Sequence, residues 1–328
     1  MNTNTKIKAG ITGGAGYTGG ELIRLLLMHP QLEIVFVHSK SNAGKKVYEV
    51  HTDLLGETNL SFSDTLSDNM DVLFLCLGHG ESMKFLQANK IESRIKIIDL
   101  SQDFRPGQSA GENKFVYGLT ESNKEKIKTA HYLANPGCFA TCIQLALLPL
   151  AQHNLIEQDV HINATTGSTG AGQSLSATSH FSWRNNNLSV YKAFEHQHLK
   201  EIKASIGQVQ KGFDAALHFI PMRGNFTRGI LASVYMKCEK NADELSLLFK
   251  DYYKESPFVH VAPFAVDLKQ VVNTNKCFIQ IEKHGDQVFI TSAIDNLLKG
   301  ASGQAVQNMN IMFGVEETSG LRLKAIGF

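Results

Sequence analysis

The residue best suited to covalent chemistry in this chain is Cys138, in the segment Ala134-Asn-Pro-Gly-Cys-Phe-Ala-Thr141. Helical apolar spacing follows the Pro-Gly pair, so the sequence predicts a helix over 139–152 that opens at this cysteine. The oriented N–H groups and macrodipole of a helix N-terminus favour a thiolate, which is a strong nucleophile. We therefore predict that Cys138 is catalytic. The other cysteines are interpreted as small buried hydrophobes: Cys76, Cys142, Cys238 and Cys277.

Histidine is the usual partner for proton transfer near neutral pH. The chain has thirteen, and the densest group is His196-Gln-His198. We expect one of the pair to serve Cys138 and the other to be structural or to bind substrate, and the sequence leaves open which is which. No third residue at metal-ligand spacing accompanies them, so we predict no metal site.

A glycine-rich turn near the N-terminus has the spacing of a dinucleotide-binding motif, with Gly14, Gly16 and Gly19 as the GxGxxG positions. It lies between a predicted strand, 6–11, and a predicted helix, 20–28. A pyrophosphate would meet backbone N–H groups there, whereas a bare glycine turn without a ligand is the alternative. The predicted cofactor contacts in this turn are Thr12, Gly13, Gly14, Ala15, Gly16, Tyr17, Thr18 and Gly19.

The second predicted strand, 32–38, runs out into Ser39-Lys-Ser41 without a carboxylate. An acidic residue at this point usually holds the ribose of NAD, whereas hydroxyls and a lysine suit the 2′-phosphate of NADP. We therefore predict NADP, with Ser39 and Ser41 as contacts. An ordinary polar loop is the alternative.

Three further segments combine glycine, hydroxyl or guanidinium groups in the way that anion sites do. They are Thr166–Gly172, Arg223–Gly229 and the stretch that ends at Arg105. Taken singly, each arginine is better interpreted as a solvated side chain than as a ligand.

In the first part of the chain, short apolar runs at 32–38, 70–77 and 95–100 alternate with helical segments such as 81–88. This order predicts an α/β fold with a Rossmann-type, doubly wound parallel sheet. Beyond the Cys138 helix the pattern changes to alternating strands at 230–237 and 278–282, with an amphipathic helix at 242–254. It predicts a second, α+β domain with a mixed sheet, and the final segment 301–314 again has helical spacing.

Composition excludes several classes of protein. The net charge is +1 and basic residues are scattered over 328 residues, so nucleic acid is not an expected partner. No apolar run approaches the length of a membrane span or signal peptide, which excludes a membrane partner. Five cysteines without paired spacing argue against a disulfide framework. We expect a cytoplasmic enzyme with an anionic small-molecule substrate.

With these residues in place, the chain resembles the N-acetyl-gamma-glutamyl-phosphate reductases, relatives of aspartate-semialdehyde dehydrogenase. The likeness runs through nearly the whole chain in order and spacing. It includes GGAGYTGGEL at 13–22, DLSQDFR at 99–105, YGL at 117–119, NPGCFAT at 135–141, GNFTRGIL at 224–231 and DNLLKGASGQAVQNMN at 295–310.

The resemblance implies NADPH-dependent reduction of an acyl phosphate in arginine biosynthesis, through a thioester on Cys138. It implies an NADP-binding domain at 1–140, a catalytic and dimerisation domain at 141–298, and a C-terminal helix at 299–328 that returns to the first domain. It also implies a homo-oligomer, a dimer or tetramer. Further cofactor contacts are expected at Gly78, Ser168, Gly170 and Asn296, and substrate contacts at Arg105, Asn135 and Arg228.

Two alternatives remain at this point. The same chemistry could act on an N-succinyl-glutamyl, aminoadipyl or aspartyl phosphate, because no motif selects the acyl group. A non-catalytic, nucleotide-sensing protein could also use this fold. The cysteine at a helix start argues against the second alternative.

Overall fold

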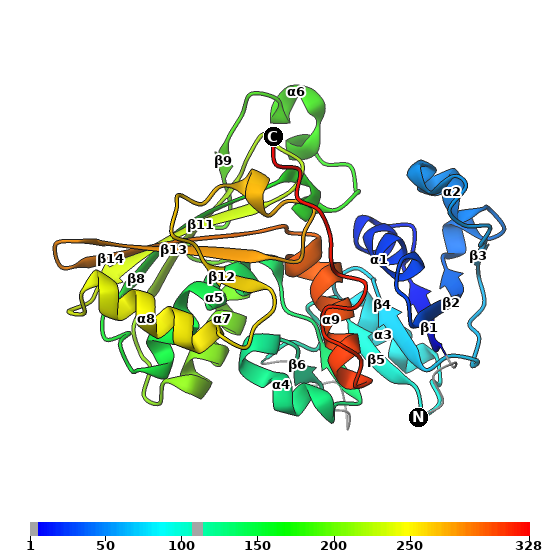
Figure 1. Cartoon of the computed structure of the whole chain (residues 1–328). Helices are drawn as coiled ribbons and strands as arrows, with labels where there is room; N and C mark the ends of the chain where they lie inside the picture. The colour runs from blue at the N-terminus through cyan, green and yellow to red at the C-terminus, as the bar shows by residue number, and fades with distance from the viewer. Residues whose placement is uncertain (1–5, 107–113) are drawn as a thin grey trace. The chain divides into compact units, whose positions relative to one another are not determined.

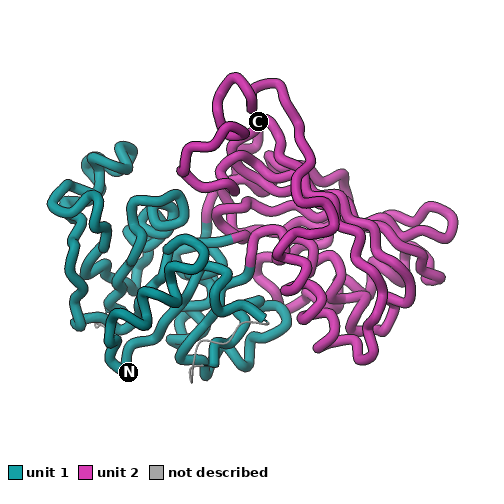
Figure 2. The backbone as a smooth tube through the Cα atoms, turned by 180° about the vertical axis from the view of Figure 1, so that it is seen from behind, with its two compact units in different colours: residues 1–136, 301–322 teal, residues 137–300, 323–328 magenta. Residues whose placement is uncertain are grey.

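A computed structural model describes residues 6–106 and 114–328 and divides the chain into two compact units (Figure 2). Unit 1 comprises residues 1–136 and 301–322, and unit 2 comprises residues 137–300 and 323–328. Each unit is built on one seven-stranded sheet. The final segment, 299–328, therefore divides between the units, and its last six residues belong to unit 2.

The sheet of unit 1 is entirely parallel, with the strand order β3-β2-β1-β4-β5-β7-β6 (Figure 1). This is the predicted Rossmann-type arrangement. Its strands are β1 (Ile7–Thr12), β2 (Leu32–His38), β3 (Phe62–Ser63), β4 (Val72–Leu75), β5 (Lys96–Asp99), β6 (Val116–Tyr117) and β7 (Tyr132–Ala134). Its α-helices are α1 (Tyr17–Leu27), α2 (Val47–Val50), α3 (Glu81–Ala88), α4 (Thr120–Lys128) and α9 (Gly303–Met312).

The strands of unit 1 follow the apolar runs of the sequence because the interior of a parallel sheet is covered on both faces. One core cluster joins β4 and β5 through Leu73, Leu75 and Ile97. The predicted strand 70–77 is wrong at both ends, since β4 is only Val72–Leu75. Helix α1 begins at Tyr17, three residues before the predicted start, because the glycine turn itself leads into it.

The sheet of unit 2 is mixed, as predicted, with the order β12-β13-β14-β11-β8-β10-β9. Strand β8 runs parallel to β10 and antiparallel to β11. The strands are β8 (Val160–Thr166), β9 (Ser189–Val190), β10 (Leu217–Arg223), β11 (Ile230–Lys237), β12 (Val259–Val261), β13 (Cys277–His284) and β14 (Gln287–Ile294). The α-helices are α5 (Cys138–Gln152), α6 (Phe181–Arg184), α7 (His198–Val209) and α8 (Ala242–Tyr253).

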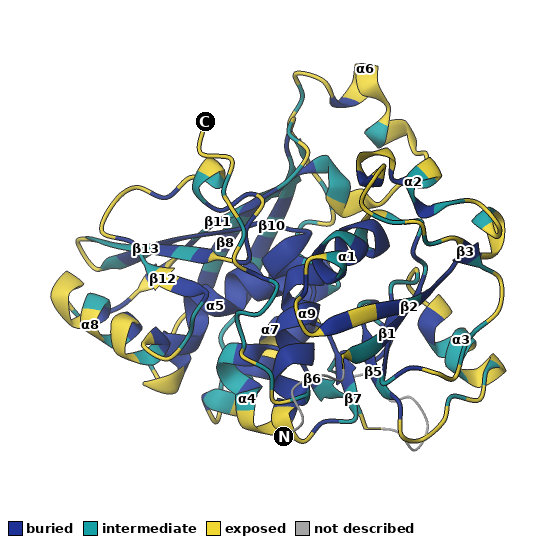
Figure 3. Ribbon diagram, turned by 45° about the vertical axis from the view of Figure 1, so that its right-hand side comes forward, coloured by how far each residue is buried: buried dark blue, intermediate teal, exposed yellow. Residues whose placement is uncertain are grey.

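Helix α5 is the core helix of unit 2 and opens at Cys138, as predicted, with Gly137 at its N-cap. Every residue from Phe139 to Ala151 is buried, and Figure 3 shows the helix in the colour of buried residues. It packs on β11 and β14 and against α7. A helix that is apolar on all sides needs such enclosure, and this holds its first turn in place.

A π-helical turn, Leu298–Ser302, follows β14 and leads into α9. The predicted helix 301–314 is therefore an α-helix only over Gly303–Met312. Within unit 1, α9 packs against α1 and α4, and Asn308 Nδ2 donates to the carbonyl of Gly118 at 2.8 Å. None of the helices described in the structure is long and apolar enough to cross a membrane.

Candidate functional site

The glycine turn of unit 1 has a backbone that only glycine permits at its start. Gly13 has φ +70°, and a Cβ there would lie 2.2 Å from the carbonyl oxygen of Cys76. The preceding Thr12 is buried, and its hydroxyl donates to the carbonyl of Phe74 at 3.2 Å. The turn is thus bound tightly to β4, and the described contact of the Thr12 hydroxyl is to the sheet.

The opposite side of this turn is open. Gly16 is the N-cap of α1, and a Cβ built on it would meet nothing closer than 3.6 Å. His51 Nε2 lies 2.8 Å from the carbonyl of Gly14, and burial lowers the pKa of this histidine, which keeps it neutral. Free backbone amides at a helix start with room beside them fit a dinucleotide pyrophosphate.

The loop after β2 presents Lys40 and Ser41 as exposed side chains, while Ser39 is buried. No carboxylate follows β2 itself, but one approaches from the neighbouring strand, which the sequence analysis missed. Burial and Lys40 lower the pKa of His38, and the backbone and charge of Asp64 offset this in part. Asp64 comes directly after β3, so only the strand order places it here.

Two predicted substrate residues of unit 1 make internal contacts. Arg105 is 5% exposed, so the reading of it as a solvated side chain is wrong. Its Nε donates to the carbonyl of Asn135 at 2.9 Å and its Nη2 to that of Leu100 at 3.0 Å. Asn135 is 1% exposed and donates from Nδ2 to the carbonyl of Ala301. Gly78 is exposed, three residues before α3.

In unit 2, Cys138 is half-buried at the first residue of α5. Gly300, in the π-helical turn, lies directly against it. A Cβ at position 300 would be 2.8 Å from Cys138 Cβ and 3.2 Å from its Cα. The position of Cys138 therefore depends on the absence of a side chain at Gly300.

Both candidate histidines lie at the first turn of α5. The ring centroids of His196 and His198 are 5.4 and 6.3 Å from that of Phe139, the residue after Cys138. The two imidazoles are 4.6 Å apart and nearly perpendicular. Helix α7 carries His198 as its first residue, and its packing against α5 brings the pair to this place.

The surroundings of His196 keep its ring neutral. It is enclosed by the rings of Phe139, Tyr191 and Phe219. Burial, with the charges of Lys192 and Arg223, lowers the pKa of His196 to about 4. Its Nδ1 accepts the backbone N–H of His198 at 3.3 Å, so the single ring proton is on Nε2.

Glu201 is a buried carboxylate at this site that the sequence did not reveal. It is 3% exposed on the first turn of α7, and its Oε2 accepts the backbone N–H of Gly137, the N-cap of α5, at 2.9 Å. Its Oε1 lies 3.9 Å from His198 Nε2. One buried carboxylate thus joins the helix end that carries Cys138 to a histidine. The spacing of His198 and Glu201 by one helical turn was the available signal.

Tyr191 was also missed. Burial and the nearby charge of Cys138 raise the pKa of this phenol to about 12. The guanidinium of Arg223 lies 4.7 Å from the centre of its ring. Tyr191 follows β9, which pairs with the end of β10, and this pairing brings the two residues together.

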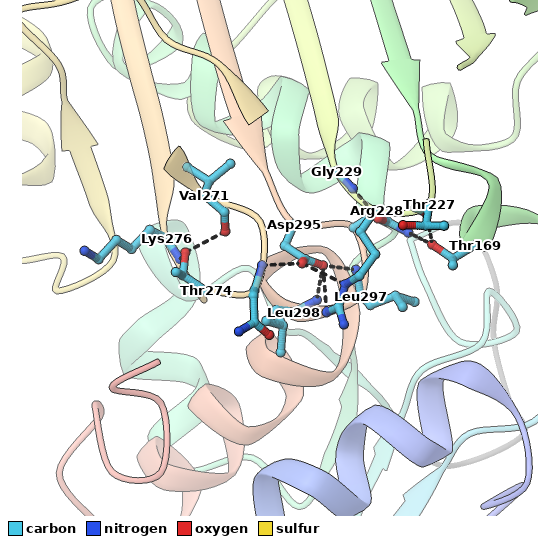
Figure 4. Close-up of polar contacts among 12 residues, drawn as sticks. Thr169, Thr227, Arg228, Gly229, Val271, Thr274, Lys276, Asp295, Leu297 and Leu298 are labelled. Atoms are coloured by element: carbon cyan, nitrogen blue, oxygen red, sulfur yellow. Dashed lines mark hydrogen bonds and ion pairs between the residues drawn. The ribbon is translucent and has the colours of Figure 1, made fainter. Parts of the chain in front are cut away.

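The two predicted anion loops of unit 2, 166–172 and 223–229, are hydrogen-bonded to each other (Figure 4). Thr169 Oγ1 donates to the carbonyl of Thr227 at 2.6 Å. Asn296 bridges the pair: its Nδ2 donates to Thr169 Oγ1 at 3.0 Å and its Oδ1 accepts the N–H of Gly229 at 2.7 Å. Both ends of the Asn296 amide are therefore engaged within unit 2. Ser168 is half-buried and Gly170 is exposed.

Arg228 forms a two-bond ion pair with Asp295, at 2.9 and 3.2 Å (Figure 4). The Asp295 side chain is fully buried and also accepts the N–H groups of Asn273, Leu297 and Leu298. This carboxylate fixes the start of the segment that ends at Gly300. The described contacts of the Arg228 guanidinium are thus structural ones.

Among the described residues, all five cysteines are free thiols. Burial raises the pKa of the Cys76 and Cys142 thiols, which keeps them protonated. Cys142, Cys238 and Cys277 are buried, as predicted, whereas Cys76 is only partly buried. Within residues 6–106 and 114–328, no group of histidine, cysteine and carboxylate side chains could hold a metal ion.

Family models match both parts of the chain. Residues 8–130 match the model described as semialdehyde dehydrogenase, NAD binding domain. Residues 138–296 match semialdehyde dehydrogenase, dimerisation domain. The chain therefore carries a nicotinamide-nucleotide-binding domain followed by a dimerisation domain, consistent with a homo-oligomer.

Solved structures share the fold. Aspartate semialdehyde dehydrogenase II from Vibrio cholerae matches 95% of this chain and 99% of its own, with a TM-score of 0.73 and 14% identity. The Candida albicans enzyme, solved with NADP, matches 94% of this chain and 99% of its own, with a TM-score of 0.69 and 16% identity.

Sequence relatives are much closer. The N-acetyl-gamma-glutamyl-phosphate reductase of Flavobacterium johnsoniae is 59% identical over 98% of this chain and 100% of that protein. The reductase of the same name from Bacteroides fragilis is 58% identical over the same shares. The chain belongs to the N-acetyl-gamma-glutamyl-phosphate reductase family, as the resemblance of its motifs predicted.

Proposed function

We propose that this protein reduces N-acetyl-gamma-glutamyl phosphate to N-acetylglutamate semialdehyde and phosphate, a step of arginine biosynthesis. The observation that carries the proposal is the position of Cys138 at the start of α5, where two histidines pack on the next residue, Phe139, and the buried Glu201 holds the N-cap. A nucleophile, a proton carrier and a group that orients it are the parts that covalent acyl transfer needs.

The cofactor that we propose is NADP, held by the Thr12–Gly19 turn and by Ser39, Lys40 and Ser41 after β2. In its reduced form it supplies the hydride that takes the enzyme-bound acyl group to the aldehyde level. The exposed Lys40 amino group and Ser41 hydroxyl, with no carboxylate at the end of β2, support binding of a 2′-phosphate, although Asp64 lies nearby, directly after β3.

The first step is assigned to Cys138. Its thiolate attacks the gamma carbonyl, a C–S bond forms, and the C–O bond to phosphate breaks, which leaves a thioester and inorganic phosphate. After reduction, the thiohemiacetal collapses, the C–S bond breaks, and the thiolate returns to Cys138 as the semialdehyde leaves. Backbone N–H groups at the start of α5, including that of Cys138, stabilise the oxyanion.

We assign proton transfer to His198 rather than His196. The Glu201 carboxylate lies 3.9 Å from His198 Nε2, where its negative charge favours the imidazolium that forms when His198 accepts a proton. His196 is held neutral in an aromatic enclosure, with a pKa of about 4, and is poorly matched to proton transfer at neutral pH. Its role is to position the loop before α7.

The other predicted site residues remain part of the proposal in revised roles. Asn296, Ser168 and Gly170 belong to the paired loops and are proposed cofactor contacts, as is Gly78. Arg105, Asn135 and Arg228 remain proposed substrate residues, although their described contacts lie within their own units. The matched dimerisation domain and the free cysteines support a homo-oligomer in the cytoplasm.

One assay tests the proposal. The purified chain is mixed with N-acetyl-gamma-glutamyl phosphate and either NADPH or NADH, and absorbance at the nicotinamide band is followed. We expect oxidation that depends on the acyl phosphate, with kcat/KM higher for NADPH. A preference for NADH would contradict the cofactor assignment, and turnover of aspartyl phosphate alone would contradict the substrate.

A further inference from the structure

Two arginines of unit 2, Arg184 and Arg223, have no acidic partner among the described residues. Arg184 is 7% exposed, and its guanidinium donates to neutral acceptors: the carbonyls of Arg223 and Thr178, and Ser189 Oγ. The Nε atoms of both Arg184 and Arg223 are buried and lack a hydrogen-bond partner. Within the described part of the chain, no carboxylate forms an ion pair with either residue.

This arrangement is costly for a protein without a ligand. Two positive charges held close together repel each other, and burial lowers the pKa of Arg184, as does the charge of Arg223. A buried cation normally has a counter-charge, and a guanidinium is best matched by a carboxylate or phosphate that accepts two parallel bonds. The missing counter-charge points to an anionic ligand.

Ring contacts connect Arg223 to the start of α5: Arg223 lies over Tyr191, the Tyr191 ring contacts His196, and His196 contacts Phe139. Strand β9 pairs with the end of β10, with Ser189 opposite Arg223, and α6 precedes this strand (Figure 1). Arg223 lies over the ring of Tyr191, whose pKa responds to the charge of Cys138. The charge of Arg223 also contributes to the low pKa of His196. A ligand held by Arg223 is therefore close to the reacting group.

We propose that Arg223, held in place by Arg184, forms a carboxylate-binding subsite for the acylated glutamyl phosphate. This inference rests on the proposed function and names a specificity-determining residue for it. Arg223 contacts the carboxylate, while Arg184 positions it by donating to its backbone carbonyl at 2.7 Å. The Tyr191 ring supports the flat guanidinium from one side.

Two carboxylates could fill this subsite: the alpha-carboxylate of the glutamyl group, or the terminal one of a dicarboxylic acyl group such as N-succinyl. The experiment measures kcat and KM with the N-acetyl and N-succinyl substrates for the wild type, Arg223→Leu and Arg223→Lys. A matched control is Lys192→Met, which removes an exposed positive charge that also acts on His196.

We expect Arg223→Leu to lower kcat/KM by about 10- to 100-fold, mostly through KM, since a charged hydrogen bond is lost. An equal loss for both substrates identifies the alpha-carboxylate. A loss confined to the N-succinyl substrate identifies the acyl carboxylate. Arg223→Lys should lose less, because it keeps the charge without the fork.

The proposal is overturned if Arg223→Leu stays within about twofold of Lys192→Met for both substrates. NADPH affinity and Tm check that each variant is folded. If the leucine variant is not, Arg223→Lys decides the matter, because an unchanged KM in that folded variant also overturns the subsite. A wild type that turns over neither substrate would instead contradict the proposed function.

Discussion

Glu201 links the helix that carries the proposed nucleophile, Cys138, to His198, the histidine that we assign as proton carrier. Its two oxygens make separate contacts, one with the N-cap amide of α5 and one beside His198. At the scale of single residues, this makes the reactive geometry depend on side chains that come from two helices. The dependence can be tested one residue at a time.

His198→Asn should lower kcat by about 100- to 10,000-fold with a small change in KM, because a proton carrier acts in the chemical step. Glu201→Gln should lower kcat less and shift the limb of the pH profile that the histidine sets. His196→Asn is the matched control, with a smaller loss. Steady-state kinetics across pH would contradict the assignment if His196→Asn cost more in kcat than His198→Asn.

Gly300→Ala places a methyl group 2.8 Å from Cys138 Cβ, so the nucleophile must move. We expect kcat to fall by about tenfold or more, because displacing a reacting atom by a fraction of an ångström is costly. Gly207→Ala in α7 meets nothing within 4 Å and is the control. Equal kcat in the two variants would show that position 300 does not place the cysteine.

At the scale of elements, the segment between β14 and the π-helical turn fixes several loops at once. Asp295 receives Arg228 and three backbone amides, and Asn296 joins the loops 166–172 and 223–229. The end of β14 therefore determines where both loops lie. Removing the charge of Asp295 should therefore affect both loops.

Asp295→Asn leaves Arg228 without its counter-charge in a partly buried place. We expect a loss of about 2–4 kcal/mol in the stability of unit 2, seen as a Tm lower by several degrees. Asp251→Asn is the control, since it removes one member of an exposed pair with Lys254 and should leave Tm nearly unchanged. A Tm for Asp295→Asn equal to that of the control would contradict the structural role of this pair.

Many of the helices, strands and turns could be predicted from the sequence, because local patterns of residues specify them. The glycine turn, the helix start at Cys138 and the change from a parallel to a mixed sheet depend on neighbouring residues. The contacts that complete the site do not. Glu201 reaches Gly137 across 64 residues and Arg228 reaches Asp295 across 67, and no local spacing marks either pair. Arg105 and Asn135 are expected from the sequence to contact substrate, and in the structure both side chains are buried.

At the scale of the whole molecule, buried histidines make stability depend on pH. Burial lowers the pKa of a set that spans both units: His29, His38, His51 and His196. Below about pH 6.5 these histidines bind more protons in the unfolded chain than in the folded chain. Their contribution to the free energy of unfolding is therefore complete above that pH and is lost as the pH falls.

His196 has a pKa of about 4 in the folded chain, so its contribution to the free energy of unfolding should be about 2 kcal/mol smaller at pH 5 than at pH 7.5. Thermal unfolding of the wild type and His196→Gln at the two pH values checks this. The wild type should lose several degrees more of Tm on acidification than the variant. Parallel losses would mean that His196 is protonated as readily in the folded chain as in the unfolded one.

The central claim is that Cys138 carries the acyl group, and intact-protein mass spectrometry tests it most directly. The enzyme is mixed with N-acetyl-gamma-glutamyl phosphate without NADPH, quenched in acid and weighed. We expect one N-acetylglutamyl adduct on Cys138, discharged when NADPH is added, and none in a folded Cys138→Ala that still binds NADPH. An adduct on that variant, or NADPH oxidation by it at the wild-type rate, would contradict the account.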